Sequence, residues 1–167
     1  DQLFKSMVRA VKTVEDSDEP VPARFEAILR EYQKTGFRWM KTLDKCGFGG
    51  ILADDMGLGK TIQVIALFED TYSSGEKAPS LVVCPASLVY NWEQEIQKFA
   101  PDLKVRSVVG TGPQRLELLE KIKEDPSGCQ ILITSYDLLK RDIAHYEGID
   151  FRFQIIDEAQ YIKNAAT

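Results

Sequence analysis

The sequence lacks the cysteine pattern of a disulfide-bonded or zinc-binding protein. Its three cysteines, Cys46, Cys84 and Cys129, are far apart and form no C-x-x-C pair. No apolar stretch approaches the roughly 20 residues that span a bilayer, and the N-terminus lacks the pattern of a signal peptide. These absences predict reduced thiols, no membrane partner, and a location in the cytoplasm of a bacterium or in the nucleus of a eukaryote.

The sequence also lacks excess positive charge. The formal net charge is -5 over 167 residues, opposite to the basic footprint of a small, self-sufficient DNA-binding domain. A local basic groove on an acidic body remains compatible with this balance. Between residues 113 and 124, Arg115, Lys121 and Lys123 are interspersed with glutamates, which predicts an ordinary solvated face. The single histidine, His145, lies in a polar stretch and is predicted to face solvent.

What is present is the balance of a soluble globular domain, with 44% apolar and 28% charged residues. Apolar positions at helical spacing predict an amphipathic helix over 3–14, and an acidic, proline-containing linker follows up to residue 22. We therefore expect an upstream remnant over 1–22 and one domain over 23–167. Because the first residue is Asp1 and no terminating helix or tail follows residue 164, we expect an excised fragment.

From residue 24 onward, helical patterns alternate with short apolar runs rich in branched residues. After a helical pattern over 24–43, the runs are 50–53, 81–84, 105–109, 131–133 and 153–156, each too short for a helix. Helical patterns lie between them at about 60–71, 87–99, 113–124 and 135–143. This alternation predicts an α/β fold in which a parallel sheet carries helices on both faces.

A glycine-rich segment, MGLGKT at 56–61, follows the first predicted strand and opens a helix. In this context Gly57 and Gly59 let backbone N–H groups turn toward phosphate oxygens. Lys60 would neutralise the β and γ phosphates of ATP, and the Thr61 hydroxyl would ligate Mg²⁺. The alternative is an ordinary glycine turn that caps a helix.

Two adjacent acids, Asp157 and Glu158, end the last apolar run. They should emerge at the carboxyl end of a buried strand, where open α/β sheets bind ligands. Asp157 would hold Mg²⁺ through water, while Glu158 would orient the water that attacks the γ phosphate. An acidic pair after a strand is commonly only a solvated turn, but the upstream phosphate loop favours the catalytic interpretation.

Five ordered segments together resemble the Swi/Snf family of helicase-related ATPases in superfamily two, as a bacterial member. They are LREYQKTGFRWM (29–40), GGILADDMGLGKT (49–61), LVVCPASLVYNWEQE (81–95), ILITSYD (131–137) and IIDEAQYIKN (155–164). The chain departs from the general G-x-x-x-x-G-K-[ST] phosphate-loop pattern at Asp54, and from the family's common form at Asp55 and Gln160. The resemblance implies a RecA-like P-loop NTPase lobe, the first of two in a motor that uses ATP and Mg²⁺.

The resemblance also assigns residues. Adenine and phosphate contacts fall on Gln33, Met56, Gly57, Leu58, Gly59, Lys60 and Thr61, and the acidic box falls on Asp157 and Glu158. Contacts to a nucleic-acid backbone fall on Pro85, Ala86, Ser87, Thr134, Ser135 and Tyr136. Hydroxyls and backbone N–H groups suit phosphate contact without sequence readout. As an alternative, Ser87 and Ser135 cap the helices that follow them.

The leading hypothesis is a translocase that moves along double-stranded DNA and remodels bound cargo such as RNA polymerase or other DNA-bound complexes. Its second RecA-like lobe, with the arginine fingers, would lie beyond Thr167. The fragment alone should therefore be nearly inactive. A non-catalytic nucleotide-binding or scaffold module is the second hypothesis, and a single-lobe phosphotransferase is the third.

Overall fold

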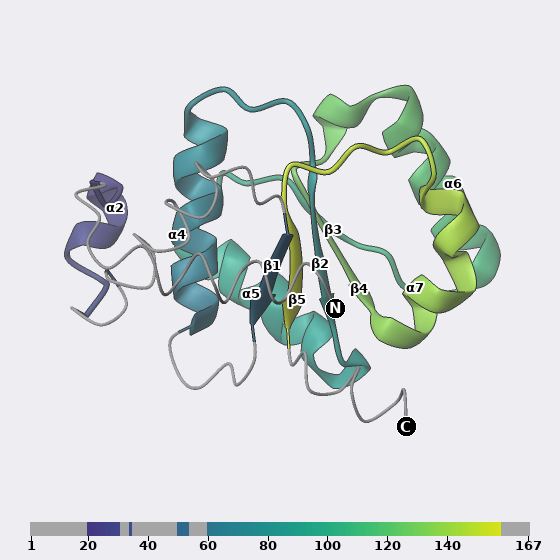
Figure 1. The fold of residues 1–167 in the computed structure, drawn as a ribbon, viewed down its shortest axis with the longest axis horizontal. Coiled ribbons are helices and arrows are strands. Elements are labelled where there is room, and N and C mark those ends of the chain that lie inside the picture. Colours follow the sequence, from purple (N-terminus) through teal and green to yellow (C-terminus); the bar gives the residue numbers. More distant parts are fainter. Residues whose placement is uncertain (1–19, 31–33, 35–49, 54–59, 158–167) are drawn as a thin grey trace.

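The sheet is five-stranded and entirely parallel in this computed structural model, which describes residues 20–30, 34, 50–53 and 60–157. The strand order is β1-β5-β2-β4-β3 (Figure 1). The strands are β1 (Gly50–Ala53), β2 (Ser80–Cys84), β3 (Val105–Ser107), β4 (Ile131–Ser135) and β5 (Gln154–Asp157). All of the predicted apolar runs are therefore strands of one sheet.

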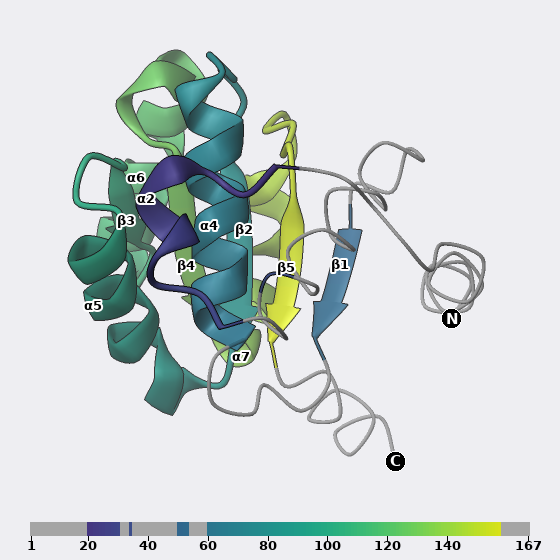
Figure 2. The same cartoon turned by 90° about the vertical axis from the view of Figure 1, so that its left-hand side faces the viewer.

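Helices cover both faces of the sheet (Figures 1 and 2). They are α2 (Ala23–Glu26), α4 (Lys60–Ser73), α5 (Val89–Phe99), α6 (Gly112–Glu124) and α7 (Tyr136–Asp142). Helices α2, α4 and α5 lie on one side, and α6 and α7 lie on the other. Short 3-10 turns span Ala86–Leu88, Pro126–Gly128 and Ile143–Tyr146. The predicted α/β architecture is confirmed.

Alternation along the central strands fills a separate core on each face. Val82 and Ile133 pack with α4 and α5, whereas Leu81, Val83 and Leu132 pack with α6 and the segment that follows α7. Because successive side chains of a strand point to opposite faces, a strand buried on both faces is apolar throughout. This is why β2 and β4, which are buried at every position, read as continuous apolar runs.

The predicted helix over 24–43 is not continuous, because α2 ends at Glu26 and residues 27–30 are not helical, whereas residues 31–33 and 35–43 lie outside the described residues. Phe25 is fully buried in the core beside α4, and Val21 belongs to the same cluster. Arg24 adds ion pairs of 3.3 Å to Glu69 and to Asp102. The predicted helix over 3–14 and most of the linker lie outside the described residues, so the boundary at residue 22 stays a prediction.

The interpretation of Arg115 as a solvated residue is also wrong. Its guanidinium is buried and donates to both carboxylate oxygens of Asp142, over 2.7 and 3.0 Å, and to the carbonyl of Gly110 over 2.7 Å. The pair joins α6 to the end of α7 and to the loop after β3. Sequence spacing missed it because Arg115 and Asp142 lie on different elements. His145, in contrast, is exposed as predicted.

Breaking this pair should destabilise the fold strongly, because an isolated charge would remain buried. Asp142→Ala is expected to lower the melting temperature by about 10 °C, measured by circular dichroism. The double variant Arg115→Met, Asp142→Leu should recover part of the loss, since it removes both charges. A single variant that melts at the wild-type temperature would contradict the structural role assigned here.

Within the part of the chain that the structure describes, no helix is both long enough and apolar enough to cross a bilayer.

Candidate functional site

The strands that lead into the predicted site segments, β1, β2, β4 and β5, end at one edge of the sheet, because all of them are parallel. The decisive register is between β1 and β5, in which Ala53 pairs with Asp157. The backbone entering the glycine-rich segment after Ala53 therefore starts beside the first acid of the acidic pair. Two segments more than 100 residues apart in the chain meet at this edge.

Helix α4 begins at Lys60, directly after that segment, and Thr61 is its second residue. The N-terminus of a helix carries partial positive charge and free N–H groups, which suit a phosphate. Thr61 is half-buried. The other predicted nucleotide and acidic-box residues lie outside the described residues: Gln33, Met56, Gly57, Leu58, Gly59 and Glu158.

Asp157 is held by two aromatic side chains from other elements. The Trp92 indole Nε1 of α5 donates to its Oδ2 over 2.8 Å, and both residues are only 2% exposed. The Tyr136 hydroxyl, at the start of α7, donates to the Asp157 carbonyl oxygen. Sequence reasoning missed Trp92, because a tryptophan on an amphipathic helix reads as a core residue and its spacing shows no polar partner.

The loop after β2 stays open to solvent. Ala86 and Ser87 are exposed and Pro85 is half-buried, within a 3-10 turn closed by the Leu88 N–H and the Pro85 carbonyl over 2.9 Å. Ser87 does not cap α5, whose N-cap position is Leu88 without a side-chain bond. The alternative capping role is therefore wrong for Ser87, and its hydroxyl remains on the surface.

The segment predicted as the loop after the fourth strand is different, because Thr134 and Ser135 end β4 itself and Tyr136 begins α7. Thr134 is fully buried and its hydroxyl donates to the Val108 carbonyl over 3.1 Å, so the predicted nucleic-acid contact is wrong for this residue. Ser135 is 3% exposed and accepts from the Leu138 N–H over 3.2 Å, which is the alternative capping role. Tyr136 is half-buried against the core with its hydroxyl on Asp157. This junction of β4 and α7 mainly supports the site instead of presenting hydroxyls to solvent.

Cys84 ends β2 in the same region and is fully buried. Burial, and secondarily the negative charge of Asp157, raise the pKa of its thiol to about 12. Burial also raises the pKa of the Cys129 thiol to about 11. Both thiols are therefore neutral near pH 7, and neither is an activated nucleophile.

These shifts predict alkaline destabilisation. A thiol whose pKa is higher in the folded than in the unfolded chain stabilises the fold fully below the unfolded value of 9.0, and this contribution is lost as pH rises through about 11 to 12. The denaturant concentration at the midpoint of unfolding should decrease as pH rises from 9 to 12. The decrease should be less steep in a Cys84→Ala, Cys129→Ala variant. Equal slopes for both proteins would contradict the assignment.

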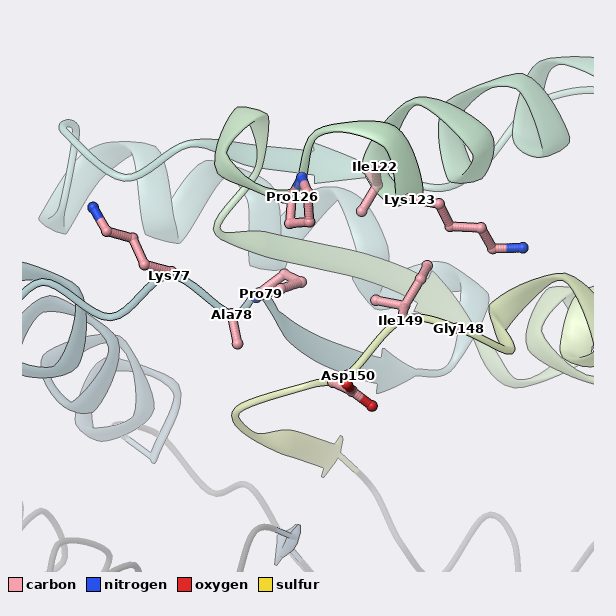
Figure 3. A pocket seen from close by; sticks show the side chains of 9 residues that line it. All are labelled: Lys77, Ala78, Pro79, Ile122, Lys123, Pro126, Gly148, Ile149 and Asp150. Atoms are coloured by element: carbon pink, nitrogen blue, oxygen red, sulfur yellow. The ribbon is translucent and has the colours of Figure 1, made fainter.

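A hollow of about 310 Å³ lies at the opposite edge, where the strands begin (Figure 3). Pro79, Ile122 and Ile149 give it an apolar lining, and Lys77 and Lys123 belong to its rim. This hollow is separate from the edge that carries Asp157.

No group of three or more histidine, cysteine, aspartate or glutamate side chains that could hold a metal exists among the described residues.

The chain is similar to several known proteins. Residues 32–167 match the family model described as SNF2-related domain. A Mycoplasma genitalium protein named an uncharacterized ATP-dependent helicase is 46% identical over 81% of this chain, and the chromatin-remodeling ATPase INO80 of Candida albicans is 40% identical over 89%. The chain spans 13% and 11% of these two proteins, respectively.

A solved structure described as the Sulfolobus solfataricus SWI2/SNF2 ATPase core in complex with dsDNA superimposes with a TM-score of 0.71. It is 44% identical and covers 92% of this chain, while the chain covers 30% of that structure. At this level of similarity the predicted RecA-like fold is confirmed.

Proposed function

Because the chain belongs to the SNF2-related domain family, as its motifs predicted, we propose that it is the ATP-binding lobe of a DNA-stimulated, double-stranded DNA translocase. The observation that carries the proposal is the Ala53–Asp157 register, which joins the phosphate-loop strand to the acidic strand. Directly after the phosphate loop, α4 begins at Lys60. The same sheet edge therefore supplies groups for both the triphosphate and its metal.

The residues at this edge fit Mg²⁺. The hydroxyl of Thr61 and the carboxylate of Asp157 are the hard oxygen donors that this ion prefers. When bound, Mg²⁺ would neutralise charge on the β and γ phosphates. Lys60 would add a fixed positive charge to the same phosphates, Gln33 would bind the adenine, and Glu158 would orient the attacking water. In this proposal Trp92 keeps the Asp157 carboxylate in place for that task.

Nucleic acid would meet the same edge beyond the nucleotide. In the sheet order, β2 follows β5, so the exposed loop at Pro85, Ala86 and Ser87 lies next to the acidic strand. An exposed hydroxyl and backbone N–H groups suit a DNA backbone. A second RecA-like lobe in the full-length protein would complete the ATP site with an arginine. The two lobes would move against each other inside the cell and displace protein cargo bound to the DNA.

The test of this function is ATP turnover by the full-length protein with and without double-stranded DNA. The proposal predicts that DNA raises the rate and that the rate falls as salt weakens phosphate contacts. Nucleotide binding without turnover under either condition would instead identify a scaffold module. A rate of ATP turnover that does not change with DNA and that requires a small-molecule acceptor would identify a phosphotransferase.

A charge at the exposed loop should weaken DNA binding. Ser87→Asp is expected to reduce DNA affinity at low salt by a factor on the order of ten, because the new carboxylate faces phosphate. Fluorescence anisotropy with labelled duplex measures this loss. The matched control is His145→Asp, an equal charge change at an exposed residue after α7. Equal effects of both variants would show that this loop does not contact DNA.

A further inference from the structure

Asp157 receives one hydrogen bond from each of two helices, α5 and α7, which follow the strands β2 and β4. Trp92 lies on α5, the helix that follows the loop at 85–87, and Tyr136 is the first residue of α7, which follows β4. We infer that Trp92 and Tyr136 are positioning residues: Trp92 couples nucleic-acid engagement at the loop over 85–87 to the metal-binding carboxylate of Asp157, and Tyr136 braces the strand that carries this carboxylate. This inference rests on the proposed function of the site.

The Trp92 connection is direct and buried. The indole N–H donates to the carboxylate over 2.8 Å, with both groups 2% exposed. A charge-assisted hydrogen bond in a site of low dielectric constant is stronger and more directional than one in water. Trp92 belongs to α5 and packs in the core cluster that also contains residues of the sheet. Its indole N–H therefore moves whenever α5 moves. A shift of α5 therefore changes how Asp157 is held.

The exposed loop is joined rigidly to that helix. Its 3-10 turn at Ala86–Leu88 runs into α5 at Val89 without an intervening coil, and Val89 is buried. Force applied by a phosphate at Ala86 or Ser87 would therefore pass into the helix. Because Trp92 lies within the first turn of α5, it is close to the end that would move.

The Tyr136 connection crosses a strand. In the sheet, β2 lies between β4 and β5, with Cys84 paired to Ser135 and Val83 paired to Ile156. The Tyr136 ring, which follows β4, thus reaches past the end of β2 to the Asp157 carbonyl on β5. The structure reassigns this tyrosine from a predicted DNA contact to a brace of the acidic strand. Its hydrogen bond fixes the backbone from which Glu158 continues.

Single-donor variants of the full-length protein test the coupling. Tyr136→Phe removes one hydroxyl, and Trp92→Phe removes the indole N–H but keeps an aromatic ring. Each should lower the DNA stimulation of ATP turnover by about tenfold, the effect of one lost hydrogen bond to a charged or fixed group. DNA affinity without nucleotide should stay at the wild-type level, because neither donor lies on the exposed loop.

A second readout needs no turnover. If the sites are coupled, a non-hydrolysable ATP analogue with Mg²⁺ changes DNA affinity by a fixed factor, and DNA changes analogue affinity by the same factor. Both variants should bring this factor toward one. A merely structural residue would change stability and leave the factor unchanged.

The matched control is Tyr72→Phe. The Tyr72 hydroxyl is likewise buried, bonded to Ser80 Oγ and the Ala78 carbonyl at 2.8 Å each, but at the opposite edge. The Tyr72→Phe variant should be less stable than the wild type, but it should keep the full DNA stimulation of ATP turnover and the full coupling between DNA and nucleotide affinity. Wild-type stimulation and coupling in both Trp92→Phe and Tyr136→Phe, or losses matched by Tyr72→Phe, would overturn the inference. A wild-type protein that DNA does not stimulate would instead refute the proposed function beneath it.

Discussion

Replacing Lys60 with alanine should reduce ATP turnover by the full-length protein by about 10² to 10³-fold, as expected when one fixed charge-stabilising group is removed from a reaction site. Lys60 opens α4 directly after the phosphate loop, at the sheet edge that carries Asp157. Phosphate release measured with saturating ATP and DNA checks the loss. Lys77→Ala, which changes a lysine at the rim of the opposite hollow, should keep the wild-type rate.

The role proposed for Glu158 gives a companion result. Glu158→Gln keeps the size of the side chain but removes its charge, so we expect nucleotide binding to persist while turnover is lost. Unchanged turnover in both Lys60→Ala and Glu158→Gln would end the assignment of this edge as a hydrolytic site.

The second large effect concerns the chain by itself. We expect the 167-residue chain to bind ATP weakly and to hydrolyse it about 10³ to 10⁵ times more slowly than the full-length protein, because an arginine from a second lobe would supply transition-state charge. Single-turnover measurements on both proteins under the same conditions compare them. Matching rates would contradict the proposal that another lobe completes the site.

The sequence predicted the sheet well because its signals are local. Each strand is a short apolar run buried on both faces, and its position follows from the run itself. Boundaries were less accurate where hydrogen bonds decide them. Strand β3 was expected to reach residue 109 but ends at Ser107, although the Val108 N–H still donates to the Ile133 carbonyl over 2.8 Å. Gly110, with a φ of 96°, then turns the chain toward α6.

The side-chain contacts of the site could not be predicted from the sequence, because they join residues that are far apart in the chain. Trp92 and Asp157 are 65 positions apart, and no periodicity within α5 tells a buried indole with a carboxylate partner from one surrounded by apolar groups. Hydroxyl residues pose the same problem. Thr134 lies within β4 and Ser87 lies in the turn after β2, yet Thr134 is fully buried and Ser87 is exposed, because helices cover both faces of the strand but not the turn.

The burial of the Arg115–Asp142 ion pair could not be predicted from the sequence either. Arg115 belongs to a helix whose other charges are solvated, and its capture by Asp142 depends on how α6 and α7 pack together. A single sequence reports the charge pattern of one helix but not the partner that a neighbouring element supplies.

The most direct test is a crystal structure of the full-length protein with a non-hydrolysable ATP analogue and Mn²⁺ in place of Mg²⁺, with the ion located by its anomalous signal. The account predicts one ion at the edge shared by β1 and β5, bound by the Thr61 hydroxyl at about 2 Å and by Asp157 directly or through one water. Lys60 should contact the β and γ phosphates. An ion and triphosphate bound away from Asp157, with Lys60 pointing elsewhere, would contradict the central claim.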